Sequence, residues 1–239
     1  MDAVLFDFAG TLFMPRAADE LVLDAARGLG LDLAADDMRR LSDDYTAAGV
    51  PGGPYPTTVP DDVASLYERR DLSSKNHRAA YLGLLSNVDH PHPGLPAAIY
   101  DRILEPEGWL PYADARQVVD ELERRGMRVG LISNVGFDIR PILRGHGFRQ
   151  LARSPTLSYE LGVIKPDRRI FEAALSALGA DASATLMVGD HPEVDRGGEA
   201  LGIRTLILPM TPPGSVHGLT QVLSAVGEDQ RRSSARFAR

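Results

Sequence analysis

AVLFDFAGT, residues 3–11, is the stretch that decides the predicted fold. Its apolar part, residues 3–6, is short and uninterrupted, and a turn signal follows at residues 9–11. This pattern is typical of a strand buried on both faces of a parallel sheet. Asp7 stands where that strand ends. Because ligands bind at the carboxyl ends of the strands in such sheets, Asp7 is the first candidate for a functional residue.

A long helical stretch follows, from about residue 16 to residue 105. Apolar residues recur there three or four positions apart, as at Leu21, Ala25 and Leu29. Loops rich in proline and glycine separate some of the segments, and no strand is expected among them. The predicted helices cover residues 17–29, 34–48, 61–70, 77–88 and 95–104.

After Tyr112 the pattern alternates between strand and helix. The predicted strands are residues 128–133, 185–188 and 204–208, and the predicted helices are residues 113–126, 137–146, 168–178 and 194–201. Alternation of this kind predicts an α/β fold with a doubly wound parallel sheet and right-handed crossovers. The helical stretch is then a domain inserted after the first strand. The predicted division is a core of residues 1–14 and 108–225, an insertion of residues 15–107, and a disordered tail of residues 226–239.

Composition excludes several classes of function. The chain has 239 residues, a formal net charge of −7 and no cysteine, so disulfides, thiolate catalysis and zinc–thiolate sites are ruled out. A net negative charge gives no affinity for nucleic-acid phosphates, so we expect a small-molecule substrate. The sequence lacks an apolar run near the roughly 20 residues that span a bilayer, and it lacks a basic secretory signal. We therefore expect a cytoplasmic protein without a membrane partner, either a monomer or a homodimer.

Polar residues mark four strand ends or loops of this predicted sheet. They are Asp7, the pair Ser133 and Asn134, Lys165, and Asp190. Because strand ends share one edge, we expect these residues to converge on one crevice. The two carboxylates would repel each other unless a hard divalent cation such as Mg²⁺ lay between them. The hydroxyl and the ammonium could hold phosphoryl oxygens, and a carboxylate can attack phosphorus.

Four motifs containing these residues occur in a fixed order. They are DFAGT at residues 7–11, LISN at 131–134, KPD at 165–167, and VGD at 188–190 followed by Asp195 and Gly198. In order and spacing they resemble the motifs of the haloacid dehalogenase superfamily. The helical insertion is similar to the cap domain that one large branch of that superfamily places between its first two motifs. The expected fold is thus a Rossmann-like core with an α-helical cap.

The resemblance implies a hydrolase of the phosphatase class with Asp7 as its nucleophile. It also implies that Mg²⁺ is the cofactor, held by Asp7, the backbone carbonyl of Ala9 and Asp190. Asp195 lies near the metal as a ligand or as a support for one. The expected substrate is a small phosphorylated metabolite, which would react through an aspartyl-phosphate.

The same resemblance assigns the substrate contacts. Ser133 and Lys165 hold the transferring group and count with Asp7 as catalytic. Thr11 and Asn134 support the loops around that group and complete the expected substrate-binding set.

One position departs from the family pattern. Most phosphatases of this superfamily carry a second aspartate two residues after the nucleophile, which protonates the leaving oxygen; here that residue is Ala9. Protonation of the leaving group by a general acid typically accelerates a reaction about 10²- to 10⁴-fold, which lowers the activation free energy by roughly 3–5 kcal/mol. Alkyl phosphates are therefore expected to be poor substrates. One interpretation is a relocated acid, with His191 and the cap histidines His77, His90 and His92 as candidates.

Three other interpretations stay open. Phosphonoacetaldehyde hydrolase, a relative, also has alanine here and forms a Schiff base with a cap lysine; Lys75 and Lys165 are the chain's two lysines, and Lys75 is the one in the predicted cap. A 2-haloacid dehalogenase is a further alternative, although those relatives lack the acidic fourth motif formed here by Gly189 and Asp190. The chain could also be a non-catalytic, ligand-binding homologue.

Overall fold

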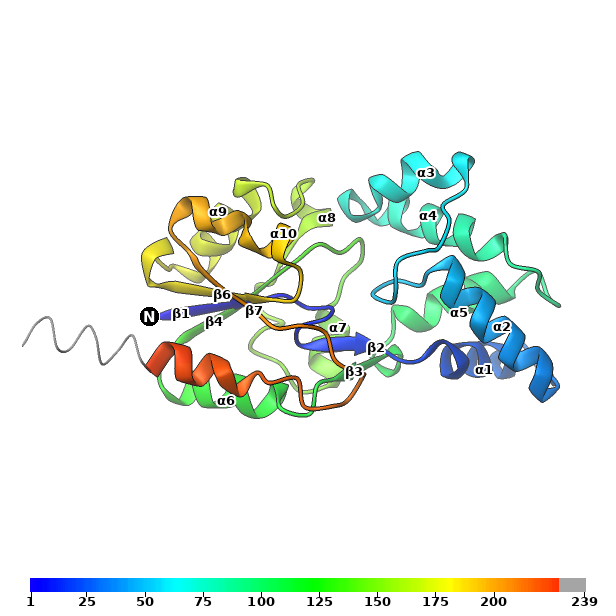
Figure 1. Cartoon of the computed structure of the whole chain (residues 1–239), viewed down its shortest axis with the longest axis horizontal. Coiled ribbons are helices and arrows are strands. Elements are labelled where there is room, and N and C mark those ends of the chain that lie inside the picture. The colour runs from blue at the N-terminus through cyan, green and yellow to red at the C-terminus, as the bar shows by residue number, and fades with distance from the viewer. Residues whose placement is uncertain (228–239) are drawn as a thin grey trace, which may run out of the picture.

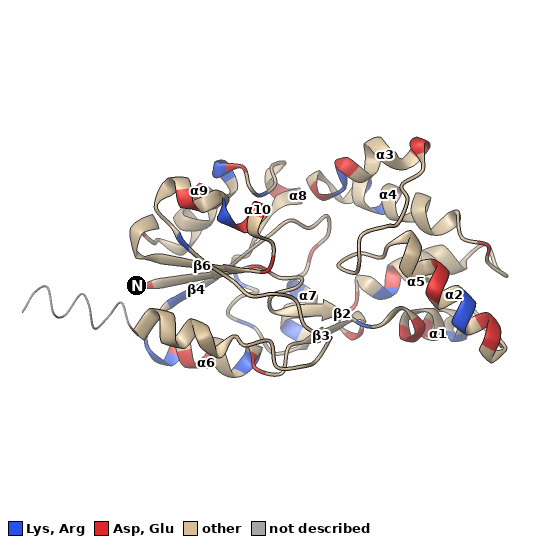
Figure 2. Cartoon of the chain, viewed as in Figure 1, with Lys and Arg blue, Asp and Glu red and all other residues tan. Residues whose placement is uncertain are grey.

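A computed structural model describes residues 1–227 (Figure 1). The predicted tail therefore lies outside the described residues except for residues 226 and 227, which belong to a helix that begins at residue 220. No helix in residues 1–227 is long and apolar enough to cross a membrane. Acidic and basic residues are interspersed along the helices (Figure 2).

A parallel sheet forms the centre of the fold, as predicted. Within the described residues it has five strands in the order β5-β4-β1-β6-β7. These strands are β1 (Ala3–Phe6), β4 (Arg128–Ser133), β5 (Thr156–Leu157), β6 (Thr185–Gly189) and β7 (Arg204–Ile207). β1 lies between β4 and β6, with Phe6 opposite Leu131 on one side and Val188 on the other. The central place of β1 explains why the run that encodes it is apolar throughout.

Both faces of β1 are covered by apolar side chains. Val4 and Phe6 belong to one buried cluster with Val118 of the helix below the sheet in Figure 1, whereas Leu5 belongs to another with Phe171 of the helix above it. The helices of this part are α6 (Ala115–Arg124), α7 (Arg140–Gly145), α8 (Ser158–Leu161), α9 (Arg168–Leu178) and α10 (Pro192–Asp195). The expected α/β fold is therefore confirmed.

A group of helices in residues 18–103, between β1 and β4, lies at the far end of the molecule from the N-terminus (Figure 1). They are α1 (Ala18–Gly28), α2 (Ala35–Ala48), α3 (Asp61–Glu68), α4 (Ser74–Ser86) and α5 (Leu95–Ile103). They enclose their own apolar cluster, which includes Leu41, Tyr45, Leu84 and Ile99. This arrangement is consistent with a cap, and we use that name for α1–α5; the predicted domain boundaries stay a prediction.

Two short strands join the cap to the sheet region. β2 (Phe13–Pro15) and β3 (Trp109–Pro111) pair antiparallel, and sequence analysis missed both. Each has three residues, too few to show a period of two. Trp109 anchors this ribbon, because its indole Nε1 donates a hydrogen bond to the carbonyl of Ile103 at 2.8 Å.

The predicted helix over residues 194–201 is wrong. α10 ends at Asp195, and a 3₁₀ helix, Arg196–Leu201, replaces the expected α-helical turns. Gly197 and Gly198 lower the helix propensity here, and Gly197 packs closely against the backbone of Pro166. The predicted helix over residues 137–146 is also shorter than expected, since α7 begins at Arg140, with a proline in its first turn.

Candidate active site

Lys165 lies at the centre of a buried group of charges. Its Nζ is 2.9 Å from Oδ1 of Asp7 and 2.6 Å from Oδ1 of Asp195. The lysine side chain is 1% exposed, that of Asp7 13% and that of Asp195 0%. Burial opposes the charged ammonium, but the attraction of the two carboxylates outweighs burial and raises the pKa of Lys165. The lysine is therefore a fixed positive charge beside Asp7.

Three carboxylates converge around this lysine. Oxygens of Asp7, Asp190 and Asp195 lie within 4.8 Å of one another, so the cluster could hold a metal ion. Burial, followed by repulsion from Asp7 and Asp195, raises the pKa of Asp190 to about 7. Burial also raises the pKa of Asp7, although Lys165 opposes the shift. A single ammonium does not balance these three carboxylates, and a hard divalent cation fits this set of oxygens.

The loop after β1 packs closely against the carboxylate of Asp190. Gly10 has a φ of +81°, and a Cβ at this position would lie 2.5 Å from Oδ2 of Asp190. Only glycine satisfies both the conformation and the contact. Thr11 is fully buried, and its Oγ1 donates to Oδ1 of Asp190 at 3.4 Å. Thr11 thus contacts the acid cluster directly.

Asp195 already uses both carboxylate oxygens. Oδ1 pairs with Lys165, and Oδ2 accepts the backbone N–H of His191 at 3.0 Å. Gly189 allows this approach, because a Cβ there would collide with the carboxylate of Asp195. Of the two roles expected for Asp195, these bonds favour support of the site over direct metal ligation.

Asn134 fixes the backbone that carries Lys165. Its Oδ1 accepts the N–H of Lys165 at 2.7 Å, and its Nδ2 donates to the carbonyl of Lys165 at 3.0 Å. These bonds engage both ends of the side-chain amide, and Asn134 also lines the cavity described next, so its predicted substrate contact stays a prediction. Ser133, at the end of β4, is 2% exposed and lines the cavity described next.

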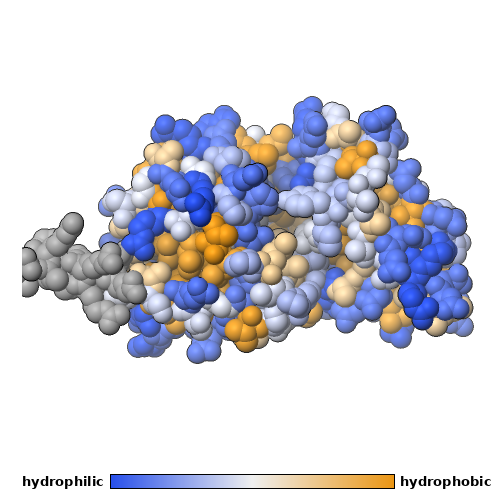
Figure 3. All heavy atoms as spheres, in the orientation of Figure 1, coloured by the Kyte–Doolittle hydropathy of each residue, from blue (hydrophilic) through white to orange (hydrophobic). Residues whose placement is uncertain are grey.

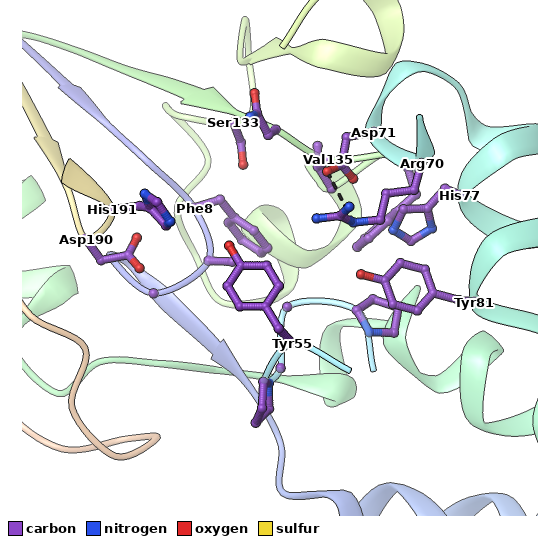
Figure 4. Close-up of a pocket in the computed structure, with 18 of the residues that line it drawn as sticks. Phe8, Tyr55, Arg70, Asp71, His77, Tyr81, Ser133, Val135, Asp190 and His191 are labelled. Carbon is purple, nitrogen blue, oxygen red and sulfur yellow. Dashed lines mark ion pairs between the residues drawn. The ribbon is translucent and has the colours of Figure 1, made fainter. Parts of the chain in front are cut away.

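A cavity of about 170 Å³ lies between the strand ends and the cap (Figure 4). The space-filling view in Figure 3 shows a hollow between these two parts. The core side of the cavity includes Phe8, Ala9, Ser133, Asp190 and His191, and its cap side includes Tyr55, Arg70, Asp71, His77 and Tyr81. Asp190 and the hydroxyl of Ser133 thus face cap side chains across one space, whereas Asp7, Lys165 and Asp195 do not line it.

The predicted cap candidates differ in position. His77 lines the cavity, and its Nδ1 is 2.8 Å from the hydroxyl of Tyr100. Burial, followed by repulsion from Arg70, lowers the pKa of His77 to about 3, so its imidazole is neutral near pH 7. Lys75 is exposed, and neither it nor His90 nor His92 lines this cavity. The structure gives the Schiff-base interpretation no support.

A buried serine that the sequence pattern does not reveal ties the cap to the core. The Oγ of Ser158 accepts the N–H of Val135 at 2.9 Å and donates to the carbonyl of Asp71 at 2.7 Å. Asp71 belongs to the 3₁₀ turn Arg70–Leu72, before α4. A serine in a short apolar segment carries no sequence signal for such a contact.

The family follows from a comparison with known proteins. A family model described as haloacid dehalogenase-like hydrolase matches residues 1–202. The chain belongs to this family. This match confirms the haloacid dehalogenase-like hydrolase family that the four motifs predict.

Individual relatives match part of the chain. A haloacid dehalogenase-like hydrolase domain-containing protein 3 from Danio rerio is 32% identical over 111 residues, 46% of each chain. A phosphoserine phosphatase from Thermus thermophilus is 36% identical over 97 residues, 40% of this chain and 39% of its own. These matches span less than half of each relative. The magnesium-bound HAD-hydrolase YfnB from Bacillus subtilis has the same fold, with a TM-score of 0.65, 18% identity and coverage of 94% and 98%.

Proposed function

We propose that this hydrolase removes the phosphoryl group of a small phosphorylated metabolite through an aspartyl-phosphate on Asp7. The observation that carries the proposal is the buried contact between Lys165 and Asp7 within a cluster of three carboxylates. The ammonium holds one oxygen of the Asp7 carboxylate. The names of relatives, such as phosphoserine phosphatase, support a phosphorylated substrate.

Magnesium is the proposed cofactor. Asp7, Asp190 and the backbone carbonyl of Ala9 would hold it, with Asp195 supporting them through Lys165. When bound, Mg²⁺ supplies positive charge that offsets the carboxylates and the phosphoryl oxygens. The raised pKa of Asp190, caused by burial and by the neighbouring acids, agrees with a site built for a cation.

The chain's own residues account for the transfer. A carboxylate oxygen of Asp7 forms a bond to phosphorus while the bond from phosphorus to the leaving oxygen breaks. Ser133 donates a hydrogen bond and Lys165 provides charge to the phosphoryl oxygens. Water then attacks phosphorus, which releases phosphate and restores Asp7. Most of the catalysis is positioning and charge neutralisation.

The leaving oxygen needs a proton that Ala9 cannot supply. We propose that the enzyme favours leaving groups of low pKa, such as those of aryl or acyl phosphates. His191 is the relocated acid that the structure favours among the predicted candidates, since it lines the cavity and its Nδ1 has no hydrogen-bond partner. Dehalogenation is disfavoured, because the acid cluster includes Asp190 and Asp195.

Magnesium binding tests the cofactor directly. We expect calorimetry to show Mg²⁺ binding at millimolar concentration to the unmodified protein, and binding at least about tenfold weaker to Asp190→Asn, because a ligand is neutralised. Asp181→Asn is the matched control, since Asp181 is exposed and precedes the opposite end of β6. Equal binding by both Asn variants, or no binding by the unmodified protein, would show that the assigned site is wrong.

A further inference from the structure

The cap side of the cavity contains a cation that the proposed reaction does not use. Among the described residues that line the cavity, Arg70 is the sole arginine or lysine. Its side chain is 21% exposed. In Figure 4 its guanidinium extends from the cap side into the cavity, toward Phe8. A guanidinium largely shielded from water is costly unless charged or polar groups compensate it.

The neighbours of Arg70 hold it in place and engage part of its guanidinium. One terminal nitrogen donates to the carbonyl of Tyr67 at 2.8 Å, and the guanidinium lies 4.1 Å from the centre of the Tyr67 ring. Its Nε forms an ion pair with Asp71 at 3.6 Å from Oδ2, and the side chain also hydrogen-bonds with Tyr81. Burial raises the pKa of Asp71, although Arg70 opposes this shift. A guanidinium has five N–H donors, so it retains capacity for a planar anion.

A contact through Ser158 joins the backbone beside Arg70 to the loop that follows β4. Ser158 joins the carbonyl of Asp71, the residue after Arg70, to the backbone N–H of Val135. Val135 lies two residues after Ser133 in the loop that follows β4. The residues that follow Arg70 and Ser133 are therefore joined through Ser158, and both Arg70 and Ser133 line the one cavity.

On the basis of the proposed function, we propose that Arg70 determines specificity by binding a second anionic group of the substrate. The substrate is then a phosphorylated metabolite with a carboxylate or a second phosphate at the end opposite the scissile phosphoryl group. Arginine forms bidentate hydrogen bonds with either anion. The rings of Phe8 and Tyr55 line the space between the two ends.

Non-hydrolysable ligands test this subsite without turnover. Calorimetry at millimolar Mg²⁺ would compare 3-phosphonopropionate and propane-1,3-bisphosphonate with propylphosphonate, which lacks the second acid. We expect one of the two diacids to bind the unmodified protein about tenfold or more tightly than propylphosphonate. The tighter diacid identifies the second group as carboxylate or phosphate.

Variants assign the preference to Arg70. In Arg70→Gln the ratio of the affinity for the tighter diacid to the affinity for propylphosphonate should fall to near one. Arg70→Lys should retain part of this ratio, because a charge remains. Arg69→Gln is the matched control, since Arg69 is adjacent and exposed, and it should keep the full ratio. A ratio near one in the unmodified protein, or a full ratio in Arg70→Gln, would overturn the subsite while leaving the proposed hydrolysis intact. Failure of all three phosphonates to bind would contradict both the Arg70 subsite and the proposed phosphoryl hydrolysis.

Discussion

Asp7→Asn is expected to lower turnover of an aryl phosphate at least about 10³-fold, because an amide cannot form the acyl phosphate. The fold should persist, since Asp7 is at a strand end and the apolar residues of β1 are untouched. Lys165 also keeps its pair with Asp195. Initial rates at saturating Mg²⁺ and circular dichroism measure the two effects.

The control for this variant lies at the other end of the same strand. Asp2 precedes β1, and its side chain is 69% exposed. Asp2→Asn removes the same charge at the opposite edge of the sheet and should leave the rate within about twofold, as expected for a surface substitution. An Asp7→Asn protein that keeps more than a few per cent of the rate would exclude Asp7 as nucleophile.

Ala9→Asp is expected to accelerate hydrolysis of an unactivated alkyl phosphate at least about tenfold, below the full range for a general acid. Ala9 lines the cavity beside the reacting groups, so a carboxyl there could reach the leaving oxygen. The gain should appear mainly in kcat, because the proton is shared in the transition state. The hydrolysis rate should also depend less steeply on the pKa of the leaving group.

Ala9→Asn separates proton donation from size. Asparagine has the shape of aspartate but no carboxyl proton, so it should bring no gain. An Ala9→Asp protein that folds and binds Mg²⁺ yet shows no acceleration would contradict the view that a missing acid limits the enzyme. That result would favour a relocated acid such as His191, or a site kept for binding.

The sequence predicted the parts of the site that follow strands. The apolar run of β1 locates Asp7, and the run before Ser133 locates β4, because a buried parallel strand has a continuous apolar pattern. For Asp7 and Lys165 the sequence predicts only that the two residues lie near each other, and it does not predict their ion pair. Asp195 pairs with Lys165 through one oxygen and accepts a backbone N–H through the other. Both contacts depend on a close approach of Asp195 to Gly189, which no sequence periodicity reveals.

Contacts between the cap and the core could not be predicted. Ser158 and Asp71 are 87 positions apart, and Arg70 reads as an ordinary surface arginine near a helix end. β2 and β3 were missed because strands of three residues show too little alternation. The 3₁₀ helix after Asp195 reflects tertiary packing of glycines against Pro166, which overrides the expected helix.

Detection of the phosphorylated residue tests the central claim most directly. The protein would be mixed with an excess of an aryl phosphate and Mg²⁺, quenched in acid within the first turnover, and analysed by peptide mass spectrometry. We expect one added phosphoryl group on the peptide that contains Asp7, lost on treatment with hydroxylamine and absent from Asp7→Asn. A phosphoryl group on another residue, with turnover that survives in Asp7→Asn, would contradict the account.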